Sequence, residues 1–323
     1  MTMSAFTVQQ LAKAHTLLAS RVASMQGRKM EEGDWAMVYC GAKNIPNEGW
    51  SNLSIDICFK GLGVEHKMMR VEKKSSIKAH CGTSLMHPAA TRSIRTGSLD
   101  RNPNDAAQDI LGQYAELISQ RRQKVSATCG PTDTPDMRTG WLLWQIDLDE
   151  FLYFEEPMLA PNPADYFAQW NERAARGARK ATRNLWIYEK RTEKKKFSVT
   201  TEAGAKIQPY FDIPAPNDPN LYYFRVQGEV LADGMVRIWI TSTTALCLRS
   251  VLGSVDGKII SSEAERLTDK INEDNPQTNM DKIVEATPIA ITKTAYARLR
   301  SCFGGVSDEH MMQQFARHLY NNK

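Results

Sequence analysis

The apolar run from Trp141 to Ile146 constrains the possible fold most strongly. A strand with one face in water alternates apolar and polar residues, whereas a strand covered on both faces is apolar throughout. Patterns typical of helices on either side of this run, over about 105–124 and 164–181, supply elements to cover such a strand. The sequence therefore predicts an α/β core with a mixed β-sheet flanked by helices.

Other segments extend this core. The pair Thr7 and Gln10 forms a capping box that predicts a helix over 7–27. The remaining predictions are strands at 35–39, 53–60, 63–71 and 185–188, a long loop at 72–102, a hairpin formed by 221–230 and 235–240, and helices at about 242–252, 261–273 and 307–320. The Pro-rich stretch 209–219 is the best candidate boundary, which divides the chain into 1–208 and a C-terminal α+β extension at 209–323.

Composition excludes several classes of protein. The six cysteines lie far apart without a CxxC pair, so a structural zinc site is not expected. Cys58 and Cys247 stand in apolar runs and are predicted to be buried thiols, which suits a reducing cytoplasm. No apolar run approaches the roughly 20 residues of a membrane span, so no membrane partner is expected. A net charge of +4 permits a nucleic-acid partner without demonstrating one.

The segment 54–67, Ser-Ile-Asp-Ile-Cys-Phe-Lys-Gly-Leu-Gly-Val-Glu-His-Lys, carries the most chemistry. It predicts a β-hairpin with a two-residue turn at Gly61-Leu62, which places Asp56 opposite Lys67. Because side chains alternate along a strand, Asp56, Glu65 and Lys67 then share one face. A four-residue turn preserves this arrangement, and a three-residue turn breaks it unless a bulge intervenes. The alternative is an exposed hairpin in which Asp56 pairs with Lys67 across the strands.

Two carboxylates beside one ammonium group on a sheet face are costly unless a cation lies between them. Magnesium suits such a site, because it prefers oxygen ligands and keeps several of its waters. A bound Mg²⁺ polarises a phosphoryl oxygen and lowers the pKa of a coordinated water. The pattern thus predicts a magnesium-dependent hydrolysis.

This acid followed by an acid-x-lysine triplet resembles the PD-(D/E)xK nuclease superfamily, which includes the type II restriction endonucleases. The resemblance covers the hairpin closely and residues 5–190 by the order of elements. It implies that Asp56, Glu65 and the carbonyl of His66 bind Mg²⁺, and that Lys67 assists the attacking water. It also implies a further acid near the first helix, for which Glu31 or Glu32 is the nearest candidate. Two departures are Ile55 in place of proline before the first acid and a short spacing between Asp56 and Glu65.

Basic residues follow the hairpin and recur in the predicted helix at 164–181. The expected contacts with DNA are Lys73, Lys74, Lys78, Arg92, Arg95, Arg173, Arg176 and Lys180. The alternative, for the basic residues after the hairpin and for those in the predicted helix, is a solvated surface without a partner. The acids Glu155 and Glu156 follow a run rich in Phe and Tyr and are expected to end a strand.

The leading hypothesis is a magnesium-dependent, sequence-specific endonuclease for double-stranded DNA, of the type II restriction class. Residues 1–208 would form its catalytic domain, and 209–323 would serve recognition or dimerisation. A homodimer is expected, because two strands require two active sites. The alternatives are a repair or recombination nuclease with the same core, and a DNA-binding module without catalysis.

Overall fold

The computed structural model describes residues 4–25, 27–46, 55–72, 75–88, 101–175, 181–200, 206–268, 285–304 and 307–322. In chain order its elements are α1 (Val8–Met25), α2 (Glu32–Lys43), β1 (Ile57–Phe59), β2 (Leu62–Val71), the 3-10 helix η1 (Ile77–His80), β3 (Ser84–Met86), α3 (Pro103–Ser126), β4 (Asp136–Gln145), β5 (Glu150–Pro157), the 3-10 helix η2 (Pro163–Asp165), β6 (Tyr166–Arg173), β7 (Thr182–Glu189), β8 (Lys195–Thr200), β9 (Lys206–Asp212), β10 (Tyr222–Arg225), β11 (Glu229–Val230), β12 (Val236–Thr241), α4 (Ser242–Leu252), α5 (Gly257–Glu265), β13 (Ala286–Ile291), α6 (Lys293–Phe303) and α7 (Asp308–Asn321).

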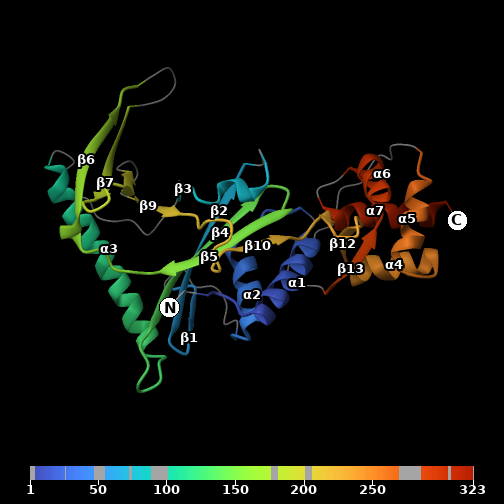
Figure 1. The fold of residues 1–323 in the computed structure, drawn as a ribbon, viewed down its shortest axis with the longest axis horizontal. Helices are drawn as coiled ribbons and strands as arrows, with labels where there is room; N and C mark the ends of the chain where they lie inside the picture. The colour runs from blue at the N-terminus through green and yellow to red at the C-terminus, as the bar shows by residue number, and fades with distance from the viewer. Residues whose placement is uncertain are drawn as a thin grey trace.

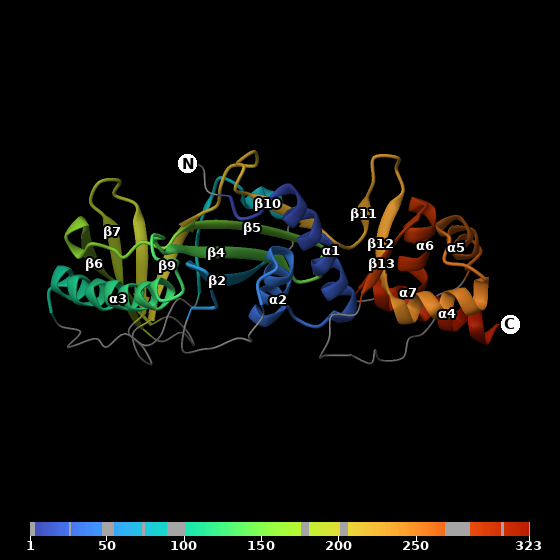
Figure 2. The same ribbon diagram turned by 90° about the horizontal axis from the view of Figure 1, so that it is seen from below.

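Three sheets follow one another along an elongated molecule (Figure 1). The central sheet has the strand order β1-β2-β4-β5-β10, and a second five-stranded sheet has the order β3-β9-β8-β7-β6. The third sheet, β11-β12-β13, lies with helices α4 to α7 at the opposite end. Figure 2 shows α3 beneath the second sheet and α1 and α2 against the central one. The predicted α/β architecture with a mixed sheet and flanking helices is therefore confirmed.

The central sheet is mixed because β2 runs parallel to β4, while its other neighbouring strands are antiparallel. Parallel neighbours need a crossover connection, and here α3 supplies the helix of that connection. One end of α3 packs Ile118 and Val125 against Ile55 and Met137 of the central region. Its other end packs on the second sheet, so α3 joins the two sheets.

The segment predicted as a strand at 35–39 is part of helix α2, so that prediction was wrong. A capping box formed by Glu31 and Asp34 begins this helix. Its large apolar residues then recur at helical spacing, and Trp35 and Tyr39 are completely buried against the central sheet. A short apolar run fits either element, and here the cap and the longer periodicity favour the helix.

The predicted helix over 164–181 is also wrong, because β6 occupies its first half. Pro163, capped by the side chain of Asn162, begins a short 3-10 turn instead, and β6 then pairs along its whole length with β7. Ala168 packs with Tyr166 and Trp170 against α3, whereas the residues between them point to the opposite face. Pairing with β7 therefore determined that this segment is a strand and not a helix.

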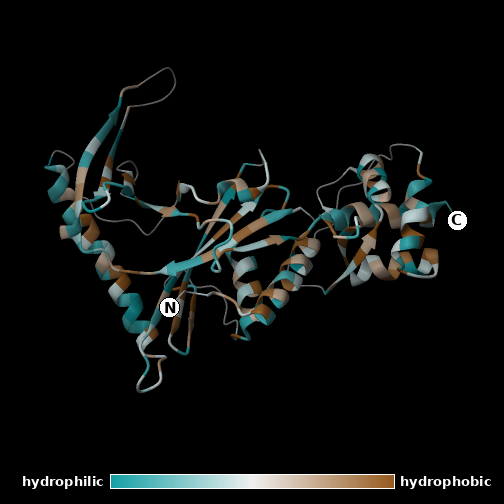
Figure 3. Ribbon diagram, in the orientation of Figure 1, coloured by the Kyte–Doolittle hydropathy of each residue, from teal (hydrophilic) through white to brown (hydrophobic). Residues whose placement is uncertain are grey.

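The C-terminal part forms its own core from β12, β13 and helices α4 to α7. Helix α4 agrees with the predicted range, α7 begins one residue later, α5 is shorter and earlier than expected, and α6 was not predicted. The expected boundary after residue 208 falls inside β9, and β10 still belongs to the central sheet. Figure 3 shows apolar segments in the strands and in the C-terminal helices, and both colours along α3, as in an amphipathic helix.

Two further observations bear on the composition. All six cysteines are free, but Cys58 is only partly buried and Cys247 is exposed, so the prediction of buried thiols holds instead for Cys40 and Cys302. Cys247 is exposed because it lies on the solvent side of amphipathic α4. Among the described residues, no helix has both the length and the apolar character that crossing a bilayer requires.

Candidate active site

The hairpin of β1 and β2 turns one position earlier than expected. Lys60 and Gly61 form its two-residue turn, both with positive φ (47° and 79°), which is typical of a type I′ turn. The register pairs Ile57 with Val64, the last pair of the hairpin, so Asp56 precedes the paired residues and is not opposite Lys67. The pairing shifts by two residues, which leaves the predicted alternation unchanged. Glu65 and Lys67 therefore share one face of β2, and Asp56 lies in the bend just before β1, where its side chain reaches the edge of β2 at His66.

The edge of β2 is open beyond Val64, because β1 pairs only with residues 62–64. There the amide N–H of His66 donates to Oδ2 of Asp56 at 2.7 Å. In a strand the N–H and C=O groups of one residue point to the same edge. The carbonyl of His66 thus also points toward Asp56, at the place where the resemblance requires a main-chain oxygen.

The two oxygens of Glu65 have different surroundings. Oε1 accepts from Nζ of Lys67 at 2.6 Å and from Nη2 of Arg121 at 3.0 Å. Oε2 is buried and has no hydrogen-bond partner among the described residues. A buried carboxylate oxygen without a partner is costly, and a divalent cation or its water would satisfy it.

Burial and the charge of Glu65 raise the pKa of Asp56 to about 7, and Glu32 adds to the rise. The His66 amide and Lys67 act in the opposite direction. Two carboxylates that repel one another and offer free oxygen ligands are the groups that a bound cation stabilises. The donors therefore fit a magnesium ion.

Among the described residues, no three His, Cys, Asp or Glu side chains are close enough together to hold a metal ion. The candidate site instead offers two carboxylates and one main-chain carbonyl. That set suits Mg²⁺, which is bound in proteins by one or two carboxylates and keeps several waters.

The side chain of His66 points away from this site and is completely buried. Its Nε2 lies 3.1 Å from Oη of Tyr153, which donates to Oε1 of Glu155 at 2.8 Å. Burial, followed by Lys67, lowers the pKa of the His66 imidazole to about 3. The imidazole is thus neutral, and His66 can serve a metal only through its main chain.

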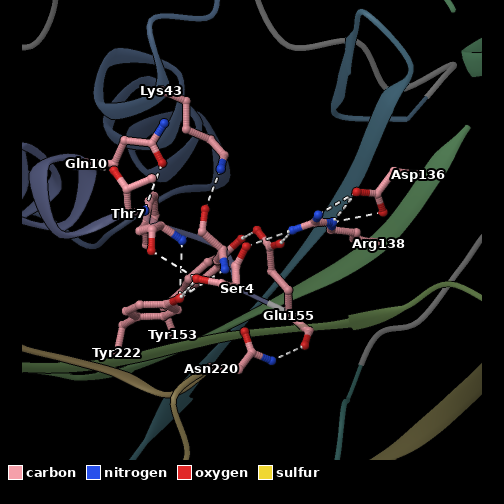
Figure 4. Close-up of polar contacts among 12 residues, drawn as sticks. Ser4, Thr7, Gln10, Lys43, Asp136, Arg138, Tyr153, Glu155, Asn220 and Tyr222 are labelled. Atoms are coloured by element: carbon pink, nitrogen blue, oxygen red, sulfur yellow. Dashed lines mark hydrogen bonds and ion pairs between the residues drawn. The ribbon is translucent and has the colours of Figure 1, made fainter. Parts of the chain in front are cut away.

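Glu155 is the centre of the buried network in Figure 4. Its Oε2 accepts from Arg138 at 2.7 Å, and its main-chain carbonyl accepts from Asn220. Arg138 also contacts Asp136 and the carbonyl of Ser4. These bonds tie the N-terminal segment, β4 and β5 together and hold Tyr153 against the strand that carries the candidate site.

Arg121 is the site residue that the sequence analysis missed. It lies on α3 three residues after Ile118 and four before Val125, on the stripe that packs against the hairpin. A charged residue on the apolar stripe of an amphipathic helix was the available signal. Its guanidinium is largely buried, with 15% of the side chain exposed, because it donates to Glu65.

Of the other predicted residues, Glu32 is near enough to raise the pKa of Asp56, and the rest lie apart from this cluster or outside the described residues. Glu31 and Glu32 are exposed at the start of α2 and line a groove of about 640 Å³ with Arg70. Lys78 places Nζ 4.0 Å from the ring centre of Tyr223. Arg173 is exposed at the end of β6, on a strand rather than on the expected helix. The predicted DNA contacts outside the described residues are Lys73, Lys74, Arg92, Arg95, Arg176 and Lys180.

Comparison of the chain with protein-family models, with curated proteins and with solved structures gave no match.

Proposed function

We propose that this protein is a magnesium-dependent endonuclease that hydrolyses phosphodiester bonds in double-stranded DNA. One observation carries the proposal. Glu65 has one oxygen bound by two cationic side chains, its other oxygen is buried without a hydrogen-bond partner among the described residues, and its charge helps to raise the pKa of Asp56. A hard cation between these two groups relieves both the repulsion and the missing contact.

The order of elements supports the same proposal. Helices α1 and α2 precede the hairpin with the acids, α3 follows, and β4 returns parallel to β2. The order behind the resemblance to PD-(D/E)xK nucleases runs over residues 5–190, and the structure keeps it at α1, the hairpin, α3 and β4 but departs from it at 35–39, which is helical, and at 166–173, which is a strand. The acids lie at the open edge of β2, where β1 has ended, so main-chain and side-chain oxygens converge there.

Bound Mg²⁺ would supply Lewis-acid chemistry and a water of lowered pKa. Asp56, Glu65 and the His66 carbonyl are the ligands that this chain offers. Lys67 is tethered to Glu65 and can orient the attacking water or the cleaved phosphate. Arg121 donates to the same oxygen of Glu65 as Lys67 does and positions that carboxylate.

The proposed substrate is duplex DNA cut at specific sequences by a cytoplasmic homodimer, as in type II restriction. Lys67, Arg121 and Lys196 line one cavity beside Glu65 and are the basic groups there that an anionic substrate would meet, together with the acids Glu156 and Glu189. A repair or recombination nuclease would share the same catalytic groups. A DNA-binding module without catalysis would bind DNA but leave it intact.

Incubation of the purified protein with supercoiled plasmid, in Mg²⁺ and in EDTA, tests the proposal. We expect nicking or linearisation only with Mg²⁺. Asp56→Ala, Glu65→Ala and Lys67→Ala should abolish cleavage while DNA binding remains, and the exposed Asp133→Ala should cleave like the wild type. Cleavage that persists in Asp56→Ala or Glu65→Ala would refute the assignment. Discrete fragments from a large DNA would distinguish site-specific cleavage from the repair alternative.

A further inference from the structure

A cavity of about 270 Å³ lies beside the candidate active site, between the central sheet and the second sheet. Glu65 and Lys67 line one wall of it, and α3 contributes Tyr114 and Arg121. Rings from β4, β6, β8 and β9 line much of the rest, together with Met158 and Leu159. Glu65 and Lys67 therefore face an aromatic cavity, whereas Asp56 is not among its lining residues.

The aromatic walls are fixed by their own packing. Trp141 is almost completely buried and stacks on Phe211, with ring centres 4.0 Å apart and planes 13° apart. Phe197 contacts Tyr114 and Tyr166, with ring centres 5.9 and 5.8 Å apart. Rigid rings in such a cavity suit a flat, aromatic ligand.

An acid stands among these rings. Glu156 accepts from the indole N–H of Trp141 at 2.8 Å, and no ion pair joins it to any Lys or Arg in the described ranges. Burial raises the pKa of Glu156. A half-buried carboxyl group with one hydrogen bond from a neutral donor, and with Lys196 near enough to oppose the rise of its pKa, has acceptor capacity left for a ligand.

The strand register places this acid relative to the active site. Glu65 pairs with Thr139 on β4, and Thr139 pairs with Glu156 on β5. The two acids therefore stand on the same face, two strand spacings or about 10 Å apart. Glu155 faces the other way, into the buried network. The side chains of Glu155 and Glu156, which are adjacent at the end of β5, thus lie on opposite faces of the sheet.

A ligand that meets these walls is planar, carries N–H donors and is attached to a phosphodiester at the end next to the candidate active site. Lys67 and Arg121 stand at that end, where both donate to Glu65, and Lys196 also lines the cavity. We propose that the cavity takes one unpaired nucleobase next to the cleaved phosphate, stacked on Phe197, with an exocyclic amino group donating to Glu156. This inference rests on the proposed nuclease function.

The chemistry predicts a preference between bases. Cytosine carries an exocyclic amino group, whereas thymine presents a carbonyl oxygen and a methyl group in its place. Thymine would thus bring an acceptor to the carboxyl group of Glu156. Removing a base from the duplex costs free energy, and this cost is smallest where the base is already unpaired.

Binding of mononucleotides to the full-length protein in EDTA tests the cavity. We expect dCMP to quench tryptophan fluorescence and to bind at least fivefold more tightly than dTMP. Phe197→Leu keeps an apolar side chain but removes the ring, so dCMP binding should weaken about five- to 150-fold. Phe167→Leu is the matched control, because Phe167 lies on the opposite face of the same sheet and stacks on Tyr188. Glu156→Gln should reduce the preference for dCMP over dTMP.

Short duplexes with one bulged cytosine or one bulged thymine then distinguish a base in DNA from a free nucleotide. We expect tighter binding of the cytosine bulge, and loss of that difference in Phe197→Leu. Equal binding of dCMP and dTMP, an unchanged affinity in Phe197→Leu, or equal binding of the two bulges would overturn the proposal. Plasmid cleavage separates it from the nuclease assignment. Cleavage without base preference refutes only the base site, and base binding without cleavage refutes only the nuclease.

Discussion

Replacing Asp56 with asparagine should stabilise the protein above neutral pH, because the surroundings of Asp56 disfavour its ionised form. Burial and Glu65 raise its pKa from an ordinary value near 3.8 to about 7. Asparagine removes the charge but keeps an oxygen to accept from the His66 amide. The full shift corresponds to about 4 kcal/mol of lost stability. Partial solvent exposure reduces this, and we expect a gain of about 1–3 kcal/mol at pH 8.

The pH dependence follows from the direction of the shift. The folded protein holds a proton on Asp56 up to about pH 7, whereas the unfolded chain releases it near pH 4. The wild type therefore loses stability as the pH rises from about 4 to 7. At pH 5 the wild-type carboxyl group is already neutral, and Asp56→Asn should change the stability little.

Thermal unfolding at pH 5 and pH 8, without divalent ions, measures both effects. A gain of 1–3 kcal/mol corresponds to about 2–5 °C in a chain of this length. Asp133→Asn, an exposed acid in the loop before β4, is the control and should change the melting temperature equally little at both pH values. Destabilisation by Asp56→Asn at pH 8, or the same gain at both pH values, would refute the reasoning. Under the proposed function, Mg²⁺ should raise the melting temperature of the wild type only.

Three further predictions concern packing and buried charges. Arg121→Ala removes a largely buried donor to Glu65 and should lower the free energy of unfolding by about 1–3 kcal/mol in denaturant titrations. Its exposed neighbour is the control, and Arg122→Ala should change the free energy of unfolding by less than about 0.5 kcal/mol. Gly140→Ala places a methyl group against the hydroxyl of Tyr153, and a cost of about 1–3 kcal/mol is expected by the same measurement; an unchanged midpoint would contradict the tight packing of β4 on β5. Glu309→Gln replaces an acceptor of bonds from the main chain and side chain of Thr241, so hydrogen exchange in α4 and α7 should accelerate while that of α3 stays unchanged; uniform acceleration would show that the C-terminal core does not open separately.

Local patterns in the sequence determined several elements by themselves. The capping box of Thr7 and Gln10 and the apolar spacing that follows predicted α1, and both hydrogen bonds of that box are present. Periodicity also predicted α3, and the apolar run at 141–146 predicted the central strand β4. These features depend on neighbours within one turn or one strand, so a single segment carries the signal.

Local sequence patterns also determined part of the candidate site. Alternation along two short strands predicted that Asp56, Glu65 and Lys67 share a face. The turn displaced by one residue kept the parity of the paired residues, whereas Asp56 lies in a bend before β1 and meets β2 at the His66 amide. A displacement that changed the pairing by an odd number of residues would have turned the side chains of one strand to the opposite face of the sheet. The parity of the pairing, rather than the turn type, was therefore the part that the sequence determined.

Tertiary structure alone decided which distant groups meet. Arg121 reaches Glu65 only because α3 crosses over between parallel strands, and Glu156 reaches the cavity only through the register of β4 with β5. The segment 166–173 became a strand because β7 was available to pair with it. Such contacts join residues far apart in the chain, and their free energy comes from burial and hydrogen bonds that exist only once both partners are in place.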